Sequence, residues 1–223
     1  MKLVNKFYNL EIEFIENQVT VITVENPEAY SKIVGAIWNQ VNGNEGDFVL
    51  SEREKIKNIS KEVDCIINPF SLDCNNKKIV THLYQELKIQ ADNTMQEELS
   101  LLNVNIMKFL DKLLLSVPYQ TTYEFNIEMI NLLKAYNVGI EMYADKLIDI
   151  IVEYLKVMSQ LCNINVFVFI DLKHYLSEEH LEQLYQEIFY LKIYLVIIEP
   201  AQTVRLENEK CWIIDNDLCI IDL

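Results

Sequence analysis

Residues 19–41, VTVITVENPEAYSKIVGAIWNQV, read as a buried strand that passes through a short turn directly into a helix. The first six residues form a dense β-branched run, which is typical of a strand in the middle of a sheet. Asn26 is suited to cap the helix, and Pro27 is favoured in its first turn. Apolar residues then recur at helical spacing from Ile33 to Val41, so one face of the helix is predicted to pack on a core.

The same strand, turn and helix mark the place where nucleotide hydrolases bind phosphate, through glycine amides and the helix N-terminus. Aligned with the pattern G-x-x-x-x-G-K-S/T, residues 24–31 read VENPEAYS, and only Ser31 fits. Both glycines are missing, Tyr30 replaces the lysine, and Glu25 and Glu28 would repel phosphate. We therefore expect a structural turn with no ATP site.

Strands and helices continue to alternate in the last third of the chain. Residues 166–171, VFVFID, resemble a Walker B strand, whose terminal acid helps to hold magnesium. Without a phosphate loop there is no bound nucleotide phosphate, so we expect no catalytic use of Asp171. A helix is predicted over residues 177–191, a buried strand over 194–198 and a hairpin over 212–221. This alternation favours an α/β fold, a head like that of P-loop NTPases with a mainly parallel sheet covered on both faces.

A helical segment interrupts this head. Between residues 95 and 117, apolar side chains recur every three or four positions and make one continuous stripe that must pack on something. Pro118 ends this helix, and a shorter helix is predicted over residues 126–136. The expected organisation is a discontinuous head of residues 1–73 and 137–223, with a helical leg of residues 74–136 inserted into it.

Composition narrows the class of protein. The chain has 223 residues, 51% of them hydrophobic, which is enough to bury a large core. No run approaches the ~20 apolar residues of a membrane span, so we expect a cytoplasmic location and no membrane partner. The five cysteines have no paired spacing, and His82, His174 and His180 belong to no nucleophile or zinc motif. We therefore expect a protein that is not an enzyme.

The charge balance bears on nucleic-acid binding. The net charge of −15 argues against indiscriminate attraction to DNA. The bases nevertheless concentrate in one stretch, at Arg53, Lys55, Lys57 and Lys61. The first three alternate, so an extended chain would point them to one side, where they could grip a phosphate backbone without reading bases. A solvated charged surface is equally compatible with this spacing.

Six stretches, spread over the chain, carry a resemblance to a known protein family. They are YSKIV at residues 30–34, KIKNISK at 55–61, LLK at 132–134, residues 166–181, IIEP at 197–200 and the terminal hairpin. With these stretches the chain resembles the ring-forming, DNA-end-binding proteins of type II-A CRISPR systems, which assist spacer acquisition.

The resemblance implies a P-loop ATPase-like head without an ATP site, an inserted helical leg, and a homotetrameric ring that threads double-stranded DNA through a lysine-lined channel. By position it assigns Lys55, Lys57, Lys61 and Lys134 to the channel, and the alternation adds Arg53. It also implies the CRISPR integrase and effector nuclease proteins as partners.

Calcium ions that stabilise the helical regions are a further implication of the resemblance, and calcium takes several oxygen ligands. The acid-rich stretch expected after the long leg helix is replaced here by residues 117–124, VPYQTTYE. Locally, the remaining ligands are Glu124 and, beyond it, Glu128.

Two other functions stay open at this point. One is an acidic scaffold that binds only protein partners, and the other is an NTP-dependent enzyme with an unrecognised phosphate site. Nucleotide titration by calorimetry would identify the enzyme, and salt-dependent DNA binding would exclude the scaffold.

Overall fold

The structure is a computed structural model that describes residues 1–124 and 128–223. The chain divides into two compact units, one of residues 1–73 with 142–223 and one of residues 74–141. We call the first the head and the second the helical unit. The sequence places these boundaries after residues 73 and 136.

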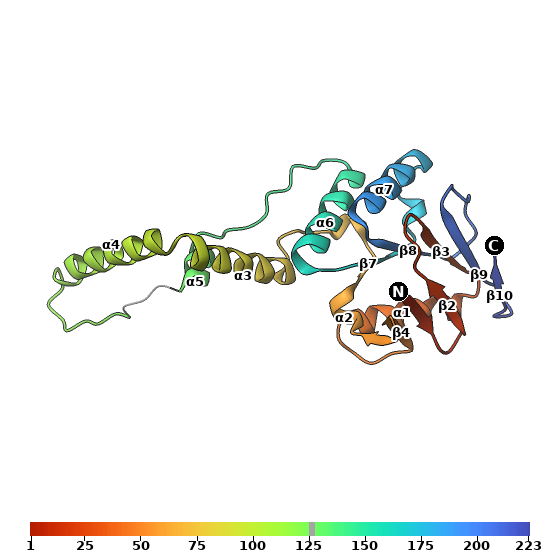
Figure 1. Cartoon of the computed structure of the whole chain (residues 1–223), viewed down its shortest axis with the longest axis horizontal. Coiled ribbons are helices and arrows are strands. Elements are labelled where there is room, and N and C mark those ends of the chain that lie inside the picture. The colour runs from red at the N-terminus through yellow and green to blue at the C-terminus, as the bar shows by residue number, and fades with distance from the viewer. Residues whose placement is uncertain (125–127) are drawn as a thin grey trace. The chain divides into compact units, whose positions relative to one another are not determined.

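A six-stranded sheet forms the centre of the head (Figure 1). Its order is β10-β9-β3-β8-β7-β6, and neighbours pair in parallel except at β10, which is antiparallel to β9. The strands are β3 (Val19–Val24), β6 (Val63–Ile66), β7 (Val166–Ile170), β8 (Tyr194–Glu199), β9 (Glu209–Ile214) and β10 (Ile220–Asp222). Every residue of β3 and β7 is buried, as the continuous apolar runs predicted.

Helices cover both faces of this sheet. In Figure 1, α6 (Leu147–Cys162) and α7 (Glu178–Leu191) lie on one side, and α1 (Pro27–Val41) with the short α2 (Ile59–Glu62) lies on the other. Two short 3-10 helices, η1 (Pro69–Ser71) and η2 (Leu172–His174), follow β6 and β7. The head is therefore α/β with a mainly parallel sheet, as predicted.

A second sheet shares the core with α1, and although the sequence indicates strands at residues 10–15 and 48–50, a separate sheet was not predicted. Its four strands are β1 (Lys2–Asn5), β2 (Leu10–Glu13), β4 (Phe48–Glu52) and β5 (Lys55–Lys57). They are antiparallel, in the order β2-β1-β4-β5. Leu3, Leu10 and Leu50 from this sheet belong to the same buried cluster as Ile33 of α1 and Val168 of β7.

The helical unit consists of α3 (Lys77–Thr94), α4 (Gln96–Leu114) and α5 (Met129–Ala135). The Tyr84 hydroxyl of α3 donates a hydrogen bond to the carbonyl oxygen of Leu133 in α5, at 3.5 Å. The Asn75 side chain bonds both the N–H and the carbonyl oxygen of Ile140, each at 2.8 Å, and so ties together the two ends of the unit. The start of the predicted helix over residues 126–136 lies outside the described residues.

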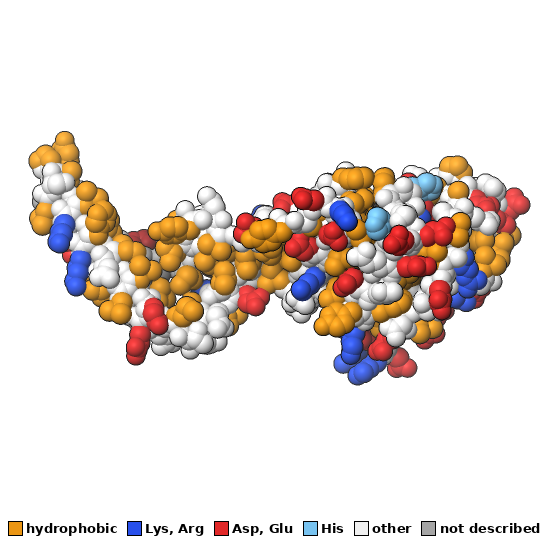
Figure 2. Space-filling model, turned by 90° about the horizontal axis from the view of Figure 1, so that it is seen from above, with side chains coloured by type: hydrophobic (Ala, Val, Ile, Leu, Met, Phe, Trp, Pro, Cys, Tyr) orange, Lys and Arg blue, Asp and Glu red, His pale blue; other side chains and the backbone are white. Residues whose placement is uncertain are grey.

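The apolar stripe of the long helix is largely exposed. Phe109 of α4 is 64% exposed, Leu113 is 50% exposed and Leu102 is 38% exposed. Figure 2 shows hydrophobic side chains gathered along this unit, at the left of the view. Within residues 1–124 and 128–223, part of this stripe therefore has no partner to cover it. Among the described residues, no helix combines the length and the apolar character needed to cross a membrane.

Candidate functional site

The predicted basic residues 53–61 lie on a hairpin and on the helix that follows it. β5 is an edge strand and pairs with β4, with Glu52 opposite Lys55. Arg53 and Glu54 connect the strands, and both have positive φ, 46° and 65°, which are the signs found in the type I′ turns of hairpins. The expectation of an extended chain through Arg53 is therefore wrong. The chain reverses there, and only Lys55 and Lys57 share a face of β5.

Neighbouring acids hold one of these bases in place. Lys57 Nζ lies 3.2 Å from Glu52 Oε2 and 3.5 Å from Glu62 Oε1. The hydrogen bond to Glu52, together with the charges of both acids, raises the pKa of Lys57 above its usual value. Lys57 therefore braces β5 against β4 and α2, and it is less available to an external ligand than the other bases.

The remaining bases of this stretch point to solvent. Arg53, Lys55 and Lys61 are all exposed, and within residues 1–124 and 128–223 none of them forms an ion pair. Residues 51–62, which we call the basic segment, contain four bases and three acids, a net charge of +1 in a chain of net charge −15. The basic segment is thus a positive surface on an acidic protein.

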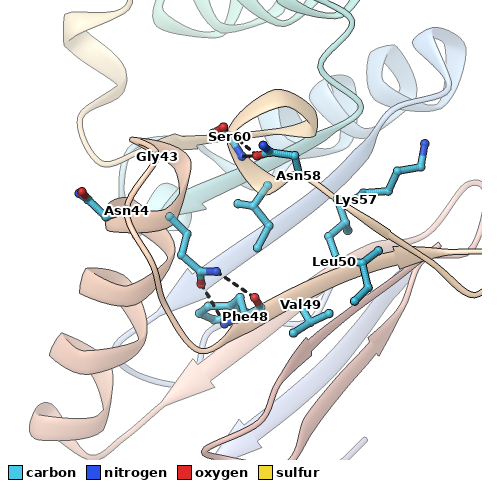
Figure 3. A pocket seen from close by; sticks show the side chains of 11 residues that line it. Gly43, Asn44, Phe48, Val49, Leu50, Lys57, Asn58 and Ser60 are labelled. Carbon is cyan, nitrogen blue, oxygen red and sulfur yellow. Dashed lines mark hydrogen bonds between the residues drawn. The ribbon is translucent and has the colours of Figure 1, made fainter.

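A pocket of about 320 Å³ lies behind the basic segment (Figure 3). On its wall, Gln40 of α1 donates to the Phe48 carbonyl oxygen at 2.9 Å and accepts from the Phe48 N–H at 2.8 Å. Asn58 caps α2 by accepting the Ser60 N–H at 2.9 Å. These bonds attach the start of the hairpin to α1 and fix the first turn of the helix that carries Lys61. The exposed bases therefore project from a braced support.

The start of α1 includes the residues aligned above with the phosphate-loop pattern, and its backbone donors are already used. Pro27 has no N–H, and the N–H groups of Glu28 and Ala29 donate to Asn26 Oδ1 at 3.0 and 3.1 Å. The N–H of Tyr30 donates to the Asn26 carbonyl oxygen at 2.9 Å. All four first positions of the helix thus lack a free donor, and a phosphate would find no amide cradle here.

Three potential metal ligands meet at the ends of β7 and β8. Their ligand atoms, one each from Asp171, His174 and Glu199, all lie within 4.8 Å of one another. Asp171 follows β7, His174 ends η2, and Glu199 is the last residue of β8. Because β7 and β8 are parallel neighbours, their carboxyl ends fall at the same edge of the sheet.

The electrostatics of this edge favour cations and not phosphate. Burial raises the pKa of Glu199 to about 7, although the N–H of Lys173 opposes the shift, and the charge of Asp171 adds to the rise. Burial, followed by the charges of Asp171 and Glu199, also raises the pKa of Tyr30 to about 12. Tyr30, which aligns with the lysine of the phosphate-loop pattern, therefore faces negative charge.

The chain matches the family described as CRISPR-associated protein (Cas_Csn2) over residues 40–218. The protein belongs to this type II-A CRISPR-associated family. The resemblance stated from the sequence is thereby confirmed. No match was found among curated proteins.

The other residues assigned by resemblance lie in the helical unit of this Csn2 family member. Lys134 is exposed in the last turn of α5. Glu124 and Glu128 are exposed and flank residues outside the described ranges. In the described part of the chain, only the group of Asp171, His174 and Glu199 brings three potential ligands together, and it contains neither of these glutamates. Calcium binding at Glu124 and Glu128 therefore stays a prediction.

Two features of this Csn2 protein were not predicted from the sequence. The first is the group at the sheet edge: His174 was assigned to no motif, and Asp171 was not connected with Glu199, although both acids end apolar runs predicted to be parallel strands. That shared position was the available signal. The second feature is the buried ion pair of Lys173 and Glu209, in which the Lys173 Nζ lies 2.8 Å from the carboxylate. Glu209 precedes the apolar run of its strand, so no pattern in the sequence indicated its burial.

Proposed function

We propose that this Csn2 family member is a non-catalytic protein that binds the ends of double-stranded DNA as a homotetrameric ring and assists CRISPR spacer acquisition. The observation that carries this proposal is the basic segment, where exposed Arg53, Lys55 and Lys61 stand without acidic partners among the described residues. Bases on a braced surface suit a regularly spaced phosphate backbone, which gives affinity without sequence readout. Lys134 is proposed to add to this surface in the assembled ring.

Assembly from several copies is supported by the apolar stripe of α4. Phe109 and Leu113 are each at least half exposed, and contiguous apolar surface of this kind is typical of protein interfaces. A ring also explains how an acidic chain can hold DNA, because closing the ring gathers one basic segment from each copy around a common axis. The CRISPR integrase and effector nuclease are the partners we propose for this ring, and calcium at Glu124 and Glu128 is its proposed stabilising ion.

The head is proposed to be a P-loop NTPase-like fold that has lost its nucleotide site. In its sheet β3 lies beside β8, and β8 lies beside β7, so the strand leading into α1 and the strand ending at Asp171 flank one common neighbour. Two features oppose ATP at this place: the α1 amides are engaged, and carboxylates stand where phosphate charge would lie.

Replacing Lys55 and Lys61 by alanine is expected to weaken binding of duplex DNA of any sequence. Each lysine that touches a phosphate releases condensed counterions, so the slope of log affinity against log salt should become flatter by about 0.9 for every phosphate that the variant leaves unneutralised. Fluorescence anisotropy over a salt series measures both quantities. Linear duplex should bind, and closed circles should bind poorly, because a ring must be threaded from an end.

The matched control replaces Lys6 and Lys156, two exposed lysines of the head outside the basic segment, by alanine. This variant removes the same charge from the chain and should keep the wild-type salt slope. An equal decrease of DNA affinity in both double variants would mean that only the net charge of the chain matters. That result would contradict the assignment of DNA binding to the basic segment. Equal binding of circles and linear fragments would contradict the ring.

Magnesium-ATP is expected to give no heat of binding and no phosphate release with the purified chain. The reason is that Asn26 and the first turn of α1 leave no free amide, and Tyr30 supplies no positive charge. Isothermal titration calorimetry measures the binding. Stoichiometric binding at micromolar affinity would favour the alternative of an NTP-dependent enzyme.

A further inference from the structure

The edge of the large sheet where β7 and β8 end carries a group of side chains that DNA binding does not use. Asp171, His174 and Glu199 are placed there by the strand pairing and by η2, which turns His174 back toward the acids. His174 Nδ1 lies 2.5 Å from Asp171 Oδ1 and 3.4 Å from Glu199 Oε2. A carboxylate from each strand thus faces one imidazole nitrogen.

Glu199 is fully buried, and its two oxygens have different surroundings. Its side chain has 0% exposure. Oε1 accepts the N–H of Lys173 at 3.0 Å, which fixes the plane of the carboxylate. Oε2 accepts no N–H or O–H from residues 1–124 and 128–223, and its neighbours are the Asp171 carboxylate and the His174 imidazole nitrogen, the latter 3.4 Å away. An unsatisfied buried carboxylate oxygen is costly, and a cation is the ligand that would satisfy it.

Asp171 and His174 supply the remaining ligand atoms, and His174 gives an ion access from solvent. Asp171 Oδ1 is also buried, and its partner among the described residues is the His174 imidazole nitrogen. The side chain of His174 is 56% exposed, so the imidazole has room to move outward. Atoms bound to one tetrahedral ion at 2.0–2.1 Å stand roughly 3.3 Å apart, so the His174 and Asp171 atoms must separate slightly when an ion enters. The exposed side of His174 leaves a position for water.

We propose that Asp171, His174 and Glu199 form a binding site for a divalent transition metal ion, with Zn²⁺ as the best match. Zn²⁺ accepts imidazole nitrogen and carboxylate oxygen in a four-coordinate site, which three protein ligands and one water complete. Calcium prefers six to eight oxygen ligands, and magnesium retains most of its water, so a nitrogen-containing set of three disfavours both. The site shares no residue with the basic segment.

The test is a titration of the chelator-treated full chain with Co²⁺, read by visible absorption, followed by competition with Zn²⁺ in a calorimeter. The chain carries Cys219→Ser, because the exposed thiol of Cys219 could bind these ions itself. We expect one ion per chain at micromolar affinity and a nitrogen and oxygen ligand spectrum without thiolate bands. His174→Ala and Glu199→Gln should each weaken binding by about tenfold or more.

His180→Ala, which removes another histidine of the head, is the control and should bind as the parent does. Binding that survives His174→Ala, or that excess Ca²⁺ displaces, would overturn the assignment. Absence of binding at micromolar concentration would likewise overturn the metal site. If the circular dichroism spectrum shows that Glu199→Gln disturbs the fold, the His174→Ala variant decides the test, because His174 is exposed.

Discussion

Replacing Lys173 by methionine is expected to lower the free energy of unfolding of the head by about 3–5 kcal/mol, because it leaves a buried carboxylate without its cation. Lys173 and Glu209 have side-chain exposures of 4% and 0%. Lys173 Nζ lies 2.8 Å from the Glu209 carboxylate and also donates to the Val204 carbonyl oxygen at 2.8 Å. Methionine fills a similar volume without the charge. Urea unfolding followed by circular dichroism measures the decrease.

The remaining partners of Glu209 cannot replace the cation. The Tyr185 hydroxyl donates to Oε1 at 2.6 Å, and the N–H of Leu206 donates to Oε2 at 3.0 Å. Burial, with the charge of Glu209, raises the pKa of Tyr185 further above neutrality, so the phenol stays a neutral donor. Without Lys173, these two hydrogen bonds and a weak one from Cys211 Sγ to Oε2 at 4.0 Å would be left to solvate a full negative charge.

Two further variants separate the buried charge from other causes. Lys210→Met, in the strand that also carries Glu209, removes a lysine whose ion pair with Asp222 is partly exposed. It should lower the free energy of unfolding by less than about 1 kcal/mol. Adding Glu209→Gln to Lys173→Met removes the stranded charge and should recover part of the stability. A destabilisation by Lys173→Met no larger than that by Lys210→Met would contradict the argument.

The elements with strong local signals were predicted well from the sequence. The apolar runs at β3, β7 and β8 and the Asn26 cap of α1 were all recognised, because a buried parallel strand and a capped helix leave marks within a few residues. The terminal hairpin is confirmed as β9 and β10, with Asp215 Oδ1 accepting the N–H groups of Asp217 and Cys219 in the turn. These features depend little on the rest of the fold.

The basic segment shows where local reading fails. Type I′ turns usually contain glycine or asparagine, whereas this hairpin turns at Arg53 and Glu54, both at positive φ. Without the turn signal, alternation of charge was taken for one extended strand. The direction in which each base points depends on the pairing of β5 with β4. A strand of only three residues gives no sequence signal for that pairing.

The metal-ligand group at the sheet edge needed long-range information. Asp171 was singled out as an acid at the end of a strand, but Glu199 lies 28 positions further along the chain. Asp171 and Glu199 are close because β7 and β8 are neighbouring strands. His174 comes close to both because Asp171 adopts a left-handed backbone conformation with φ 59°. Neither is encoded in the spacing of the three residues.

Replacing Phe167 by alanine is expected to lower the free energy of unfolding by about 3–5 kcal/mol, because it opens a cavity in the layer between the large sheet and its helices. Phe167 is the second residue of β7 and has 0% exposure. Val166 and Val168 belong to the buried cluster on the α1 side, so the alternation along the strand turns Phe167 to the face that α6 and α7 cover. Urea unfolding measures the decrease.

Phe7→Ala is the matched control, because the Phe7 side chain is 66% exposed and its removal should change stability by no more than about 0.5 kcal/mol. Phe167→Leu keeps most of the buried apolar volume, so its cost should fall between those of the two alanine variants. The order of the three variants in stability tests the packing of α6 and α7 on the large sheet. A Phe167→Ala protein as stable as Phe7→Ala would mean that α6 and α7 do not press on β7, and the predicted covering of the sheet on that face would be contradicted.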